Sequence, residues 1–467
     1  MQNIILSRSI YGKVKNKPAM VDSYGNVMTY EMLWELTYGM ENVIEKNGSE
    51  KPLVMIICSN TIACIAAYIA FIENGYTVMM LSGNTDTVRM ESLIISYQPE
   101  FIYIPEKHSM SKYIQGVNVY DFKDYVLYKT EYCHGLQIHP ELALLLSTSG
   151  STGSSKMVRI SRENIESNTE AIIHALDIEE TDRAVTSLPC SYTYGLSVIN
   201  THLRVGATIL VTDYKVADVR FWEFVKKESC TSFSGVAYTY NMLLRLGSSW
   251  TKISTLKKMT QAGEKMPLSV YEEILAIAKK NNIRFQVMYG QTEATARICV
   301  MPLKYAEIKK GSVGKVIEGG KIRIRGAGET GDGKIIYEGR NVAMGYAANR
   351  GDLSNPDEWH NILDTGDYGY IDKDGFLYVS GRNDRYIKYT GNRINLDEME
   401  LCIEKTFKCD AAIKYENGMF YIKISVDKEN EIKDYIRESF RISFANINVE
   451  YSNAGFVSHN GKKLRYI

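Results

Sequence analysis

A loop rich in serine, threonine and glycine lies between apolar residues in the stretch LLLSTSGSTGSSKMVRIS, residues 144–161. Ordering such a flexible loop costs conformational entropy. Its backbone N–H groups and hydroxyls can nevertheless surround a phosphate chain while Lys156 neutralises part of the negative charge. The P-loop spacing is absent, because two serines precede Lys156 and Met157 follows it where that motif needs a hydroxyl. A solvated linker is the alternative interpretation of this composition.

A second polar segment, VMYGQTEATAR, begins with an expected strand that ends at Tyr289 and Gly290. The hydroxyl of Thr292 and the carboxylate of Glu293 then stand at the end of a parallel strand, where they could hold a phosphate and its Mg²⁺. The same residues also fit an ordinary helix start, with Thr292 as the cap and Glu293 in the first turn. This segment alone leaves both interpretations open.

An aspartate and an arginine, Asp367 and Arg382, bracket an expected strand–turn–strand. A carboxylate can accept hydrogen bonds from both hydroxyls of a ribose, and a neighbouring guanidinium adds further donors. Two tight turns and a surface ion pair of little energetic value are the alternative interpretation. The pair is therefore a candidate ribose site.

Two shorter segments combine glycine with charged side chains. In TQAGEKM, Gly263 follows an expected strand and allows a flat ring to approach the backbone closely. In the tail HNGKKLRYI, Gly461 precedes Lys462 close to the last residue, a pattern that by itself is typical of a frayed basic terminus. Neither segment defines a chemistry alone.

Four segments together resemble a known group of enzymes. STSGSTGSSK, MYGQTEA, DTGDYGYIDKDGFLYVSGRNDRYIKYTGNRINLDEME and NGKKLR occur in the order and at the distances seen in the adenylate-forming superfamily. This superfamily includes acyl-CoA synthetases, the adenylation domains of peptide synthetases, D-alanine–carrier protein ligases and luciferases. Each motif is weak alone, but four in order over most of the chain are specific.

The resemblance implies an ATP site made of residues from several segments. It implies that the serine-rich loop orders around the β- and γ-phosphates, that TQAGEKM lies beside the adenine, and that Asp367 and Arg382 bind the ribose. The loop residues concerned are Thr148, Ser149, Gly150, Ser151, Thr152, Gly153 and Lys156. The other nucleotide-binding residues are Gly263, Glu264, Lys265, Tyr289, Gly290, Gln291, Asp367 and Arg382.

The resemblance also implies catalytic roles. Thr292 would contact the α-phosphate, Glu293 would hold Mg²⁺, and Arg393 would contact a phosphate. Asp384 matches the hinge about which a small mobile C-terminal domain turns between two half-reactions. Lys462 matches the lysine that moves in to catalyse adenylation.

The implied reaction joins a carboxylic acid to a thiol. The acid attacks the α-phosphorus of ATP, and an acyl-adenylate forms with release of pyrophosphate. The thiol of coenzyme A, or of phosphopantetheine on a separate acyl carrier protein, then attacks the carbonyl and releases AMP. Three alternatives remain open: an amino-acid–carrier protein ligase, a catalytically silent relative that binds nucleotide, and a phosphotransferase that would release ADP.

The acid pocket is expected to include Tyr192, Gly195 and Gly235. Amino-acid-activating relatives have an Asp two residues before the serine that is Ser197 here, and this chain has Gly195 at that position. A buried ammonium without a carboxylate partner is costly, so we expect an acid without an α-amino group. The alternative is that the segment YTYG is ordinary turn and core.

The elements that must position these residues follow an α/β pattern. Short β-branched runs alternate with helical patterns up to about residue 310, which predicts a large domain of mainly parallel α/β sheets. Short strands with glycine turns predict a small β-rich subdomain at about 311–383, within an N-terminal ATP- and acyl-binding domain at 1–383. A helix, a hairpin and a second helix predict a small α+β domain at 384–467.

Composition excludes some classes of partner. The chain has 467 residues, with 55 basic and 55 acidic side chains, so no global field favours nucleic acid or an acidic membrane. Ser59, Asn60 and Thr61 interrupt the most apolar segment, which predicts a strand, a turn and a helix and not a membrane span. The first residues lack the pattern of a signal peptide, so we expect a cytoplasmic protein.

Eight cysteines are scattered along the chain. No CxxC pair occurs, and no histidine stands at metal-ligand spacing from a cysteine. We therefore expect reduced cysteines that mostly fill the core.

Overall fold

The computed structural model describes residues 4–6, 8–46, 51–132, 137–147, 156–327, 331–382, 385–389, 392–440, 442–452 and 456. Contacts within the chain divide it into two compact units. The first unit comprises Met1–Lys321 and Tyr337–Leu363, and the second comprises Ile322–Ile336 and Asp364–Ile467. The predicted domain boundary at Asp384 lies outside the described residues and stays a prediction.

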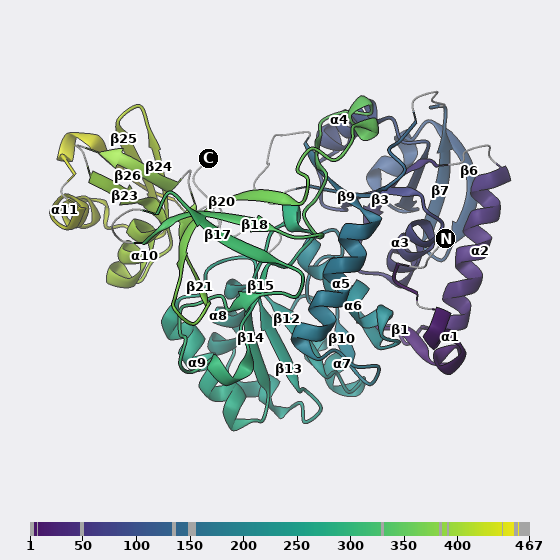
Figure 1. Cartoon of the computed structure of the whole chain (residues 1–467), viewed down its shortest axis with the longest axis horizontal. Helices are drawn as coiled ribbons and strands as arrows, with labels where there is room; N and C mark the ends of the chain where they lie inside the picture. Colours follow the sequence, from purple (N-terminus) through teal and green to yellow (C-terminus); the bar gives the residue numbers. More distant parts are fainter. Residues whose placement is uncertain are drawn as a thin grey trace. The chain divides into compact units, whose positions relative to one another are not determined.

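The first unit contains a sheet of nine described strands, in the order β16-β15-β14-β13-β12-β10-β11-β1-β2 (Figure 1). The six strands from β14 to β1 run parallel to one another, and the strands at both edges are antiparallel. The strands are β1 (Pro18–Asp22), β2 (Val27–Thr29), β10 (Arg183–Val185), β11 (Thr208–Val211), β12 (Ser232–Gly235), β13 (Lys258–Gln261), β14 (Arg284–Tyr289), β15 (Cys299–Val300) and β16 (Lys315–Val316).

A second sheet of the same unit has eight described strands, in the order β19-β9-β8-β4-β3-β5-β7-β6. Its centre, from β8 to β5, is parallel, and its outer pairs are antiparallel. The strands are β3 (Leu53–Cys58), β4 (Thr77–Ser82), β5 (Phe101–Pro105), β6 (Gly116–Phe122), β7 (Tyr125–Thr130), β8 (Leu142–Ser147), β9 (Met157–Ser161) and β19 (Gly345–Ala347).

Helices cover these sheets and also lie between them. Helix α3 contacts β1 of the nine-stranded sheet and both β3 and β4 of the eight-stranded sheet. Helix α5 contacts β8 and β9, whereas its neighbour α6 contacts β10 and β11. The helices are α1 (Arg8–Val14), α2 (Tyr30–Lys46), α3 (Ile62–Glu73), α4 (Thr87–Tyr97), α5 (Arg162–Leu176), α6 (Thr193–Arg204), α7 (Val219–Lys227), α8 (Ala237–Arg245) and α9 (Leu268–Lys280).

Strand β3 shows why this order of elements forms. All six residues of its sequence LVMIIC are buried, because helices cover both faces of the sheet. Val54 and Ile56 point into the core between the two sheets, and Met55 and Ile57 point into the core on the opposite face. The segment predicted as a strand, a turn and a helix has that structure, as β3 and α3.

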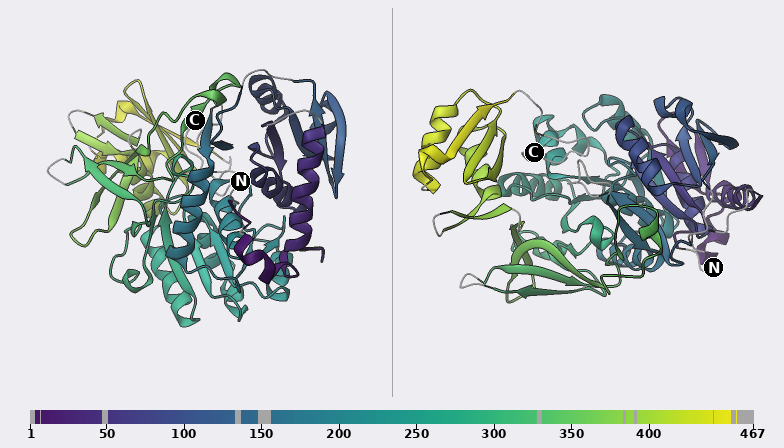
Figure 2. Two further views of the ribbon diagram at one scale, coloured as in Figure 1. Left: turned by 45° about the vertical axis from the view of Figure 1, so that its right-hand side comes forward. Right: turned by 90° about the horizontal axis from the view of Figure 1, so that it is seen from above.

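The second unit contains a four-stranded sheet in the order β17-β18-β20-β21 and a smaller α+β part. Helices α10 and α11 pack on the three-stranded sheet β24-β25-β26 of that smaller part (Figure 2). The elements are β17 (Lys321–Arg325), β18 (Gly333–Glu338), β20 (Ile362–Ile371), β21 (Leu377–Arg382), β22 (Tyr386–Tyr389), β23 (Asn392–Asn395), α10 (Leu396–Phe407), β24 (Ala411–Glu416), β25 (Met419–Ile424), α11 (Glu429–Phe440) and β26 (Ile447–Tyr451).

The predicted fold class is confirmed. The first unit is a mixed α/β structure whose central strands are parallel, and the second unit contains the expected short strands and a helix–hairpin–helix segment. Among the described residues, no helix has both the length and the apolar character that crossing a membrane requires.

Candidate active site

The carboxyl ends of three neighbouring strands in the first unit carry three of the predicted segments. Strands β12, β13 and β14 run in parallel register, with Gly235 beside Gln261 and Gln261 beside Val287. Chain segments that leave this edge of a parallel sheet lie close together, and ligands of α/β proteins bind there. The predicted adenine segment follows β13, and the predicted phosphate segment follows β14.

Side chains fix the adenine segment to the sheet and to helix α8. The Gln261 amide donates to the backbone carbonyl of Glu264 at 2.8 Å. The Glu264 carboxylate accepts the backbone N–H of Tyr238 in α8 at 3.0 Å. Gly263 adopts a φ of +99°, a conformation that favours glycine, and Lys265 is exposed. These hydrogen bonds hold the segment in place, and Gly263 adds no side chain to it.

Gly290 follows β14 at a point where the chain passes very close to itself. A Cβ at this position would lie 1.9 Å from the carbonyl oxygen of Ala296, so only glycine fits. Thr292–Ala294 then form a short 3-10 helix in which Thr292 is buried. Thr295 and Ala296 follow with φ values of +57° and +140°, which strain residues other than glycine. Backbone strain therefore lies immediately beside the predicted phosphate-binding residues.

The side chain of Asn341 holds this strained turn in place. Its amide donates to the backbone carbonyls of Ala294 at 2.8 Å and Arg297 at 2.9 Å. Its side-chain oxygen accepts the Tyr337 hydroxyl at 2.7 Å, and its backbone carbonyl accepts the Thr295 hydroxyl at 2.8 Å. Nothing local in the sequence pointed to Asn341, because it lies far along the chain from the turn.

The carboxylate of Glu293 is half-buried and fixed by a tyrosine. Its Oε1 accepts the hydroxyl of Tyr346, in β19, at 2.8 Å. Its backbone carbonyl accepts the N–H of Ala343 at 2.9 Å. A carboxylate oriented in this way supplies the hard oxygen ligands that Mg²⁺ prefers. Glu293 therefore fits the predicted role of metal ligand, and Tyr346 is a partner that the sequence did not reveal.

The predicted phosphate loop leads into the strand pair that carries this tyrosine. Lys156 is exposed and directly precedes β9. Strand β9 pairs with β19, with Val158 opposite Tyr346. Lys156, at the end of the loop, thus directly precedes the strand that pairs with the strand of Tyr346, the hydrogen-bond partner of Glu293. The other predicted loop residues lie outside the described residues; they are Thr148, Ser149, Gly150, Ser151, Thr152 and Gly153.

The predicted acid-binding residues lie at the start of α6 and at the end of β12. Tyr192 occupies the N-cap position of α6 and is buried. A Cβ at Gly195 would lie 2.3 Å from the Pro189 carbonyl oxygen. A Cβ at Gly235 would lie 3.1 Å from the side chain of Thr239. Close packing explains both glycines, and the backbone beside Gly195 leaves no space for an acidic side chain.

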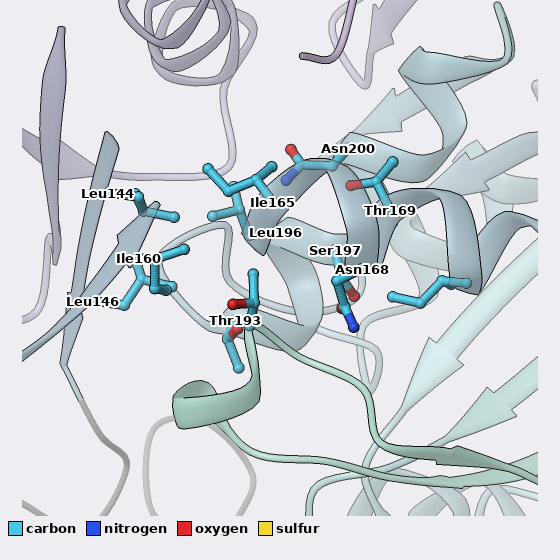
Figure 3. A pocket seen from close by; sticks show the side chains of 12 residues that line it. Leu144, Leu146, Ile160, Ile165, Asn168, Thr169, Thr193, Leu196, Ser197 and Asn200 are labelled. Carbon is cyan, nitrogen blue, oxygen red and sulfur yellow. The ribbon is translucent and has the colours of Figure 1, made fainter. Parts of the chain in front are cut away.

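Two cavities flank helix α6. The first, of about 10 Å³, lies between α5, α6 and the strands β8 and β9 (Figure 3). The second, of about 20 Å³, is lined by α6 and by strands β12, β13 and β14. Ile172 and Ser197 line both cavities. A space of this size holds about one water, so neither cavity has room for an acyl group in this structure.

In the second unit, the predicted ribose pair is brought together by strand pairing. Asp367 in β20 and Arg382 in β21 are directly opposed residues of an antiparallel pair. Asp367 is buried, and its backbone N–H donates to the Thr365 hydroxyl at 3.1 Å. That hydroxyl in turn donates to the Ile335 carbonyl at 2.9 Å. The backbone therefore places the two predicted residues side by side.

The remaining predicted residues belong to the second unit. Arg393 lies in β23, opposite Lys388 of β22. The predicted hinge, Asp384, and the predicted catalytic lysine, Lys462, lie outside the described residues. Their roles stay predictions.

Three cysteines that are distant in sequence meet in the first unit. The Sγ atoms of Cys58, Cys64 and Cys190 all lie within 4.8 Å of one another, and all three residues are buried. The described cysteines are free thiols, as expected. The cluster could not be predicted from the cysteine spacing, because its members come from β3, α3 and the segment before α6.

Comparison with known proteins identifies a family. The model of the AMP-binding enzyme family matches residues 7–347. The 2-succinylbenzoate–CoA ligase of Bacillus cereus (strain Q1) is 29% identical over 265 residues, which cover 56% of this chain and 54% of that ligase. The chain thus spans about half the length of the curated relatives it matches.

Solved structures share the fold. The o-succinylbenzoate coenzyme A synthetase of Bacillus subtilis in complex with AMP has a TM-score of 0.78 and 20% identity, over 100% of this chain and 97% of that chain. The same synthetase in complex with ATP and a magnesium ion has a TM-score of 0.75 and 20% identity, over 100% and 98%. At this level of identity, the likeness establishes the fold.

Proposed function

The chain belongs to the family of AMP-binding enzymes, and from that premise we propose that it activates a carboxylic acid with ATP and transfers the acyl group to the thiol of coenzyme A. Pyrophosphate leaves when the acyl-adenylate forms, and AMP leaves when the thiol attacks. The matched relatives are named as CoA ligases, which favours coenzyme A over a carrier protein. Because both ATP and coenzyme A are cytoplasmic substrates, we place the reaction in the cytoplasm.

The observation that carries this proposal is the strained turn after β14. It places Thr292 and Glu293 at the carboxyl edge of a parallel sheet, beside the segment that follows β13. Gly290, Asn341 and Tyr346 hold this arrangement. Preorganised groups of this kind stabilise charge that develops during a reaction. Backbone strain of this kind clusters at functional sites, which favours a function for this turn.

Each proposed nucleotide-binding residue has a distinct task. Gly263, Glu264 and Lys265 form the surface beside the adenine, and the Thr292 hydroxyl donates to an α-phosphate oxygen. Mg²⁺, when bound, neutralises charge on the phosphates, and Glu293 is its proposed ligand. The loop from Thr148 to Lys156 surrounds the β- and γ-phosphates. In the second unit, Asp367 and Arg382 bind the ribose hydroxyls, and Arg393 and Lys462 contact phosphate oxygens.

We propose an acid without an α-amino group. An ammonium buried in the acid pocket needs a carboxylate partner, and Gly195 supplies none at the position where amino-acid-activating relatives have one. The contact between Gly195 and Pro189 prevents even a small side chain there. Tyr192 and Gly235 complete the proposed pocket wall.

A pyrophosphate-exchange assay tests the proposal. The full chain is incubated with ATP, Mg²⁺, labelled pyrophosphate and a panel of carboxylic acids and α-amino acids. We expect acid-dependent exchange with at least one simple carboxylic acid, AMP as the nucleotide product when coenzyme A is added, and a thioester detected by mass spectrometry.

Each alternative gives a different result. Acid-dependent formation of ADP would indicate a phosphotransferase, and exchange with α-amino acids alone would indicate an amino-acid ligase. Exchange followed by transfer only to a phosphopantetheinylated carrier would correct the acceptor. Nucleotide binding without exchange across the panel would indicate a silent relative.

A further inference from the structure

Three buried thiols of the first unit form a cluster, which consists of Cys58, Cys64 and Cys190. Cys58 ends β3, Cys64 is the third residue of α3, and Cys190 belongs to the segment between β10 and α6. Their Sγ atoms all lie within 4.8 Å of one another. Strand β3 belongs to the eight-stranded sheet and β10 to the nine-stranded sheet. Segments that leave both sheets therefore contribute to this thiol cluster.

The thiols of the cluster make weak hydrogen bonds to backbone carbonyls and to one another. The Cys58 thiol donates to the Ile56 carbonyl at 3.4 Å, and the Cys190 thiol donates to the Ser59 carbonyl at 3.5 Å. The sulfur atoms of Cys64 and Cys190 are 3.8 Å apart. A thiol is a weak donor, so little is lost when a ligand replaces these hydrogens. In the two carbonyl contacts the thiol is the donor, and its lone pairs take no part.

The separations between the sulfur atoms match those of a metal site. A Zn–S bond is about 2.3 Å long, so two thiolates on a tetrahedral zinc ion lie about 3.8 Å apart. Cys64 and Cys190 already have this separation. The limit of 4.8 Å for all three pairs leaves the third sulfur within about 1 Å of it. The sulfur atoms of a disulfide are only about 2.0 Å apart, so the spacing favours an ion between the thiols over a bond between two of them.

The side chain of Asn60 fixes the backbone on both sides of the thiol cluster. Its amide donates to the carbonyls of Thr186 at 3.1 Å and Leu188 at 3.0 Å. Its side-chain oxygen accepts the backbone N–H of Cys190 at 2.9 Å. Asn60 lies two residues after Cys58 in the chain. It therefore holds the segment of Cys190 against the segment of Cys58, as a preformed site requires.

The N-terminus of α3 adds a favourable charge to the cluster. Thr61 is the N-cap of this helix of 12 residues, and its hydroxyl accepts the backbone N–H of Cys64 at 3.2 Å. A helix N-terminus is equivalent to about half a positive charge and favours the thiolate form of a cysteine. Three thiolates around a divalent ion carry one net negative charge. The start of α3 therefore offsets part of the cost of burying such a complex.

The cluster lies just below the surface at the end of β3. Cys58 is 6% exposed, and the next two residues, Ser59 and Asn60, are half-buried. A metal site needs an entry path for the ion, and this end of the strand provides one. The Ser59 hydroxyl, which is 2.7 Å from the hydroxyl of Tyr125, adds an oxygen group beside Cys58 in the chain.

We propose that Cys58, Cys64 and Cys190 bind one thiophilic metal ion, zinc(II) or copper(I), as thiolates. The ion replaces the three thiol protons, which pass to solvent. Thiolates select these two ions, whereas Mg²⁺ takes oxygen ligands, so the site is distinct from the one proposed at Glu293. The bound ion joins β3 and α3 to the segment that precedes Tyr192 and so stabilises the first unit. This inference is independent of the proposed reaction.

Titration of the full chain with cadmium tests the proposal, because thiolate-bound Cd²⁺ absorbs ultraviolet light in proportion to the number of thiolates. The protein is first reduced and freed of metal with a chelator. We expect one tightly bound ion per chain with the absorbance of three thiolates. Groups that only orient a ligand cost about 10- to 100-fold in metal affinity when removed. Cys190→Ala removes a ligand and should weaken binding by about 100-fold or more and lower the absorbance by about a third.

Cys230→Ala is the matched control. Cys230 is also a buried free thiol, but its Sγ donates to the Ser232 carbonyl at 3.3 Å and it is not part of the cluster. This variant should bind Cd²⁺ as the wild type does. Zinc should raise the Tm of the wild type and of Cys230→Ala but not that of Cys190→Ala, since an ion that binds only the folded chain stabilises it. Equal cadmium binding by the wild type and Cys190→Ala would overturn the proposal.

X-ray absorption of the wild type loaded with one equivalent of zinc(II), or of copper(I), gives a test that needs no variant to fold. Three sulfur neighbours of the bound ion, at about 2.3 Å for zinc, would support the site. Fewer than three sulfur neighbours in both samples would show that the three cysteines only fill the core. Competition of each ion against Cd²⁺ then identifies which of the two the site prefers, and failure of both to displace Cd²⁺ would overturn the proposal.

Discussion

Asp367 and Arg382 are Cα partners in the antiparallel pair of strands β20 and β21, although fourteen residues separate them in the chain. Directly opposed residues of such a pair project on the same face of the sheet. Strand pairing thereby sets the backbone positions of the two residues opposite each other, without dependence on loop conformation. This register is the reason to test the two residues as one ribose-binding unit.

Asp367→Ala should weaken ATP binding by about 1–3 kcal/mol, because ribose hydroxyls lose their acceptor. Calorimetry with ATP and with 3′-deoxy-ATP measures this effect. The wild type should prefer ATP, and the variant should lose that preference. Asp364→Ala is the control, since Asp364 lies on the same strand but is exposed and pairs with Arg325. Equal ATP affinity in wild type and Asp367→Ala would show that the ribose binds elsewhere.

Glu293→Gln should slow pyrophosphate exchange by about 100-fold or more. A neutral amide binds Mg²⁺ more weakly than a carboxylate does, so the metal stabilises the charge of the transition state less well. The Mg²⁺ concentration for half-maximal exchange should rise in the same variant. Tyr346→Phe removes only the hydroxyl that donates to Glu293 at 2.8 Å, so its effect should stay within about 10-fold. An unchanged Mg²⁺ dependence in Glu293→Gln would remove the metal role from this carboxylate.

Gly195→Asp should not convert the protein into an amino-acid ligase. A Cβ at this position would lie 2.3 Å from the Pro189 carbonyl oxygen, so the backbone must shift before any side chain fits. We expect destabilisation of about 1–3 kcal/mol from overpacking, seen as a lower Tm. Gly195→Ala should show most of that loss, which separates the steric effect from the charge. A well-folded Gly195→Asp protein that activates α-amino acids would contradict this interpretation.

The central strands could be predicted because their sequence carries the signal of burial on both faces. Strand β3 is a continuous apolar run, and its alternating residues fill two different cores. The strand end at Tyr289 was visible for a related reason, since Gly290 and polar residues interrupt the apolar run there. Such signals are local, so they can be recognised in the sequence without knowledge of distant contacts.

The supports of the site could not be predicted, because they depend on contacts between distant residues. Asn341 and Tyr346 reach the turn after β14 only once β19 has paired with β9. Arg297 stood at the end of a recognised motif, yet nothing in the sequence showed that it would be buried. Burial and pairing are properties of the packed structure.

The neutral form of His202 should make stability depend on pH. Burial lowers the pKa of His202 from its usual 6.5 to about 4, with Asp182 raising it and Lys258 lowering it to smaller extents. The unfolded chain binds a proton below about pH 6.5, whereas the folded chain resists protonation down to about pH 4. Neutral His202 therefore contributes about 3 kcal/mol to the free energy of unfolding above pH 6.5, and this contribution is lost as the pH falls toward 4.

Urea unfolding at pH 7.5, 6, 5 and 4.5 measures this dependence. His202→Gln keeps a polar side chain that does not titrate, so its stability should fall less steeply between pH 6.5 and 4.5 than that of the wild type. His174→Gln is the control, because His174 is exposed and pairs with Glu318 at the surface. Identical slopes in wild type and His202→Gln would show that His202 is not buried in neutral form.

Lys462→Ala separates the two half-reactions. Lys462 follows Gly461 in the tail, at the spacing of the lysine that catalyses adenylation in the family it resembles. In that family the lysine belongs to a small mobile C-terminal domain, and its charge acts only in the domain arrangement that serves acyl-adenylate formation. We expect acyl-adenylate formation to slow by about 100- to 1,000-fold, measured as single-turnover pyrophosphate release. Thioester formation from a pre-made acyl-adenylate and coenzyme A should keep nearly the wild-type rate.

Lys463→Ala is the neighbouring control, since it removes the same charge one residue further along. It should leave both half-reactions nearly unchanged if position 462 alone carries the catalytic lysine. Loss of both steps in Lys462→Ala would indicate damage to the fold, which circular dichroism would detect. If neither step slows, the tail is an ordinary basic terminus and the charge that assists adenylation comes from another residue, for which Arg393 is the first candidate to replace.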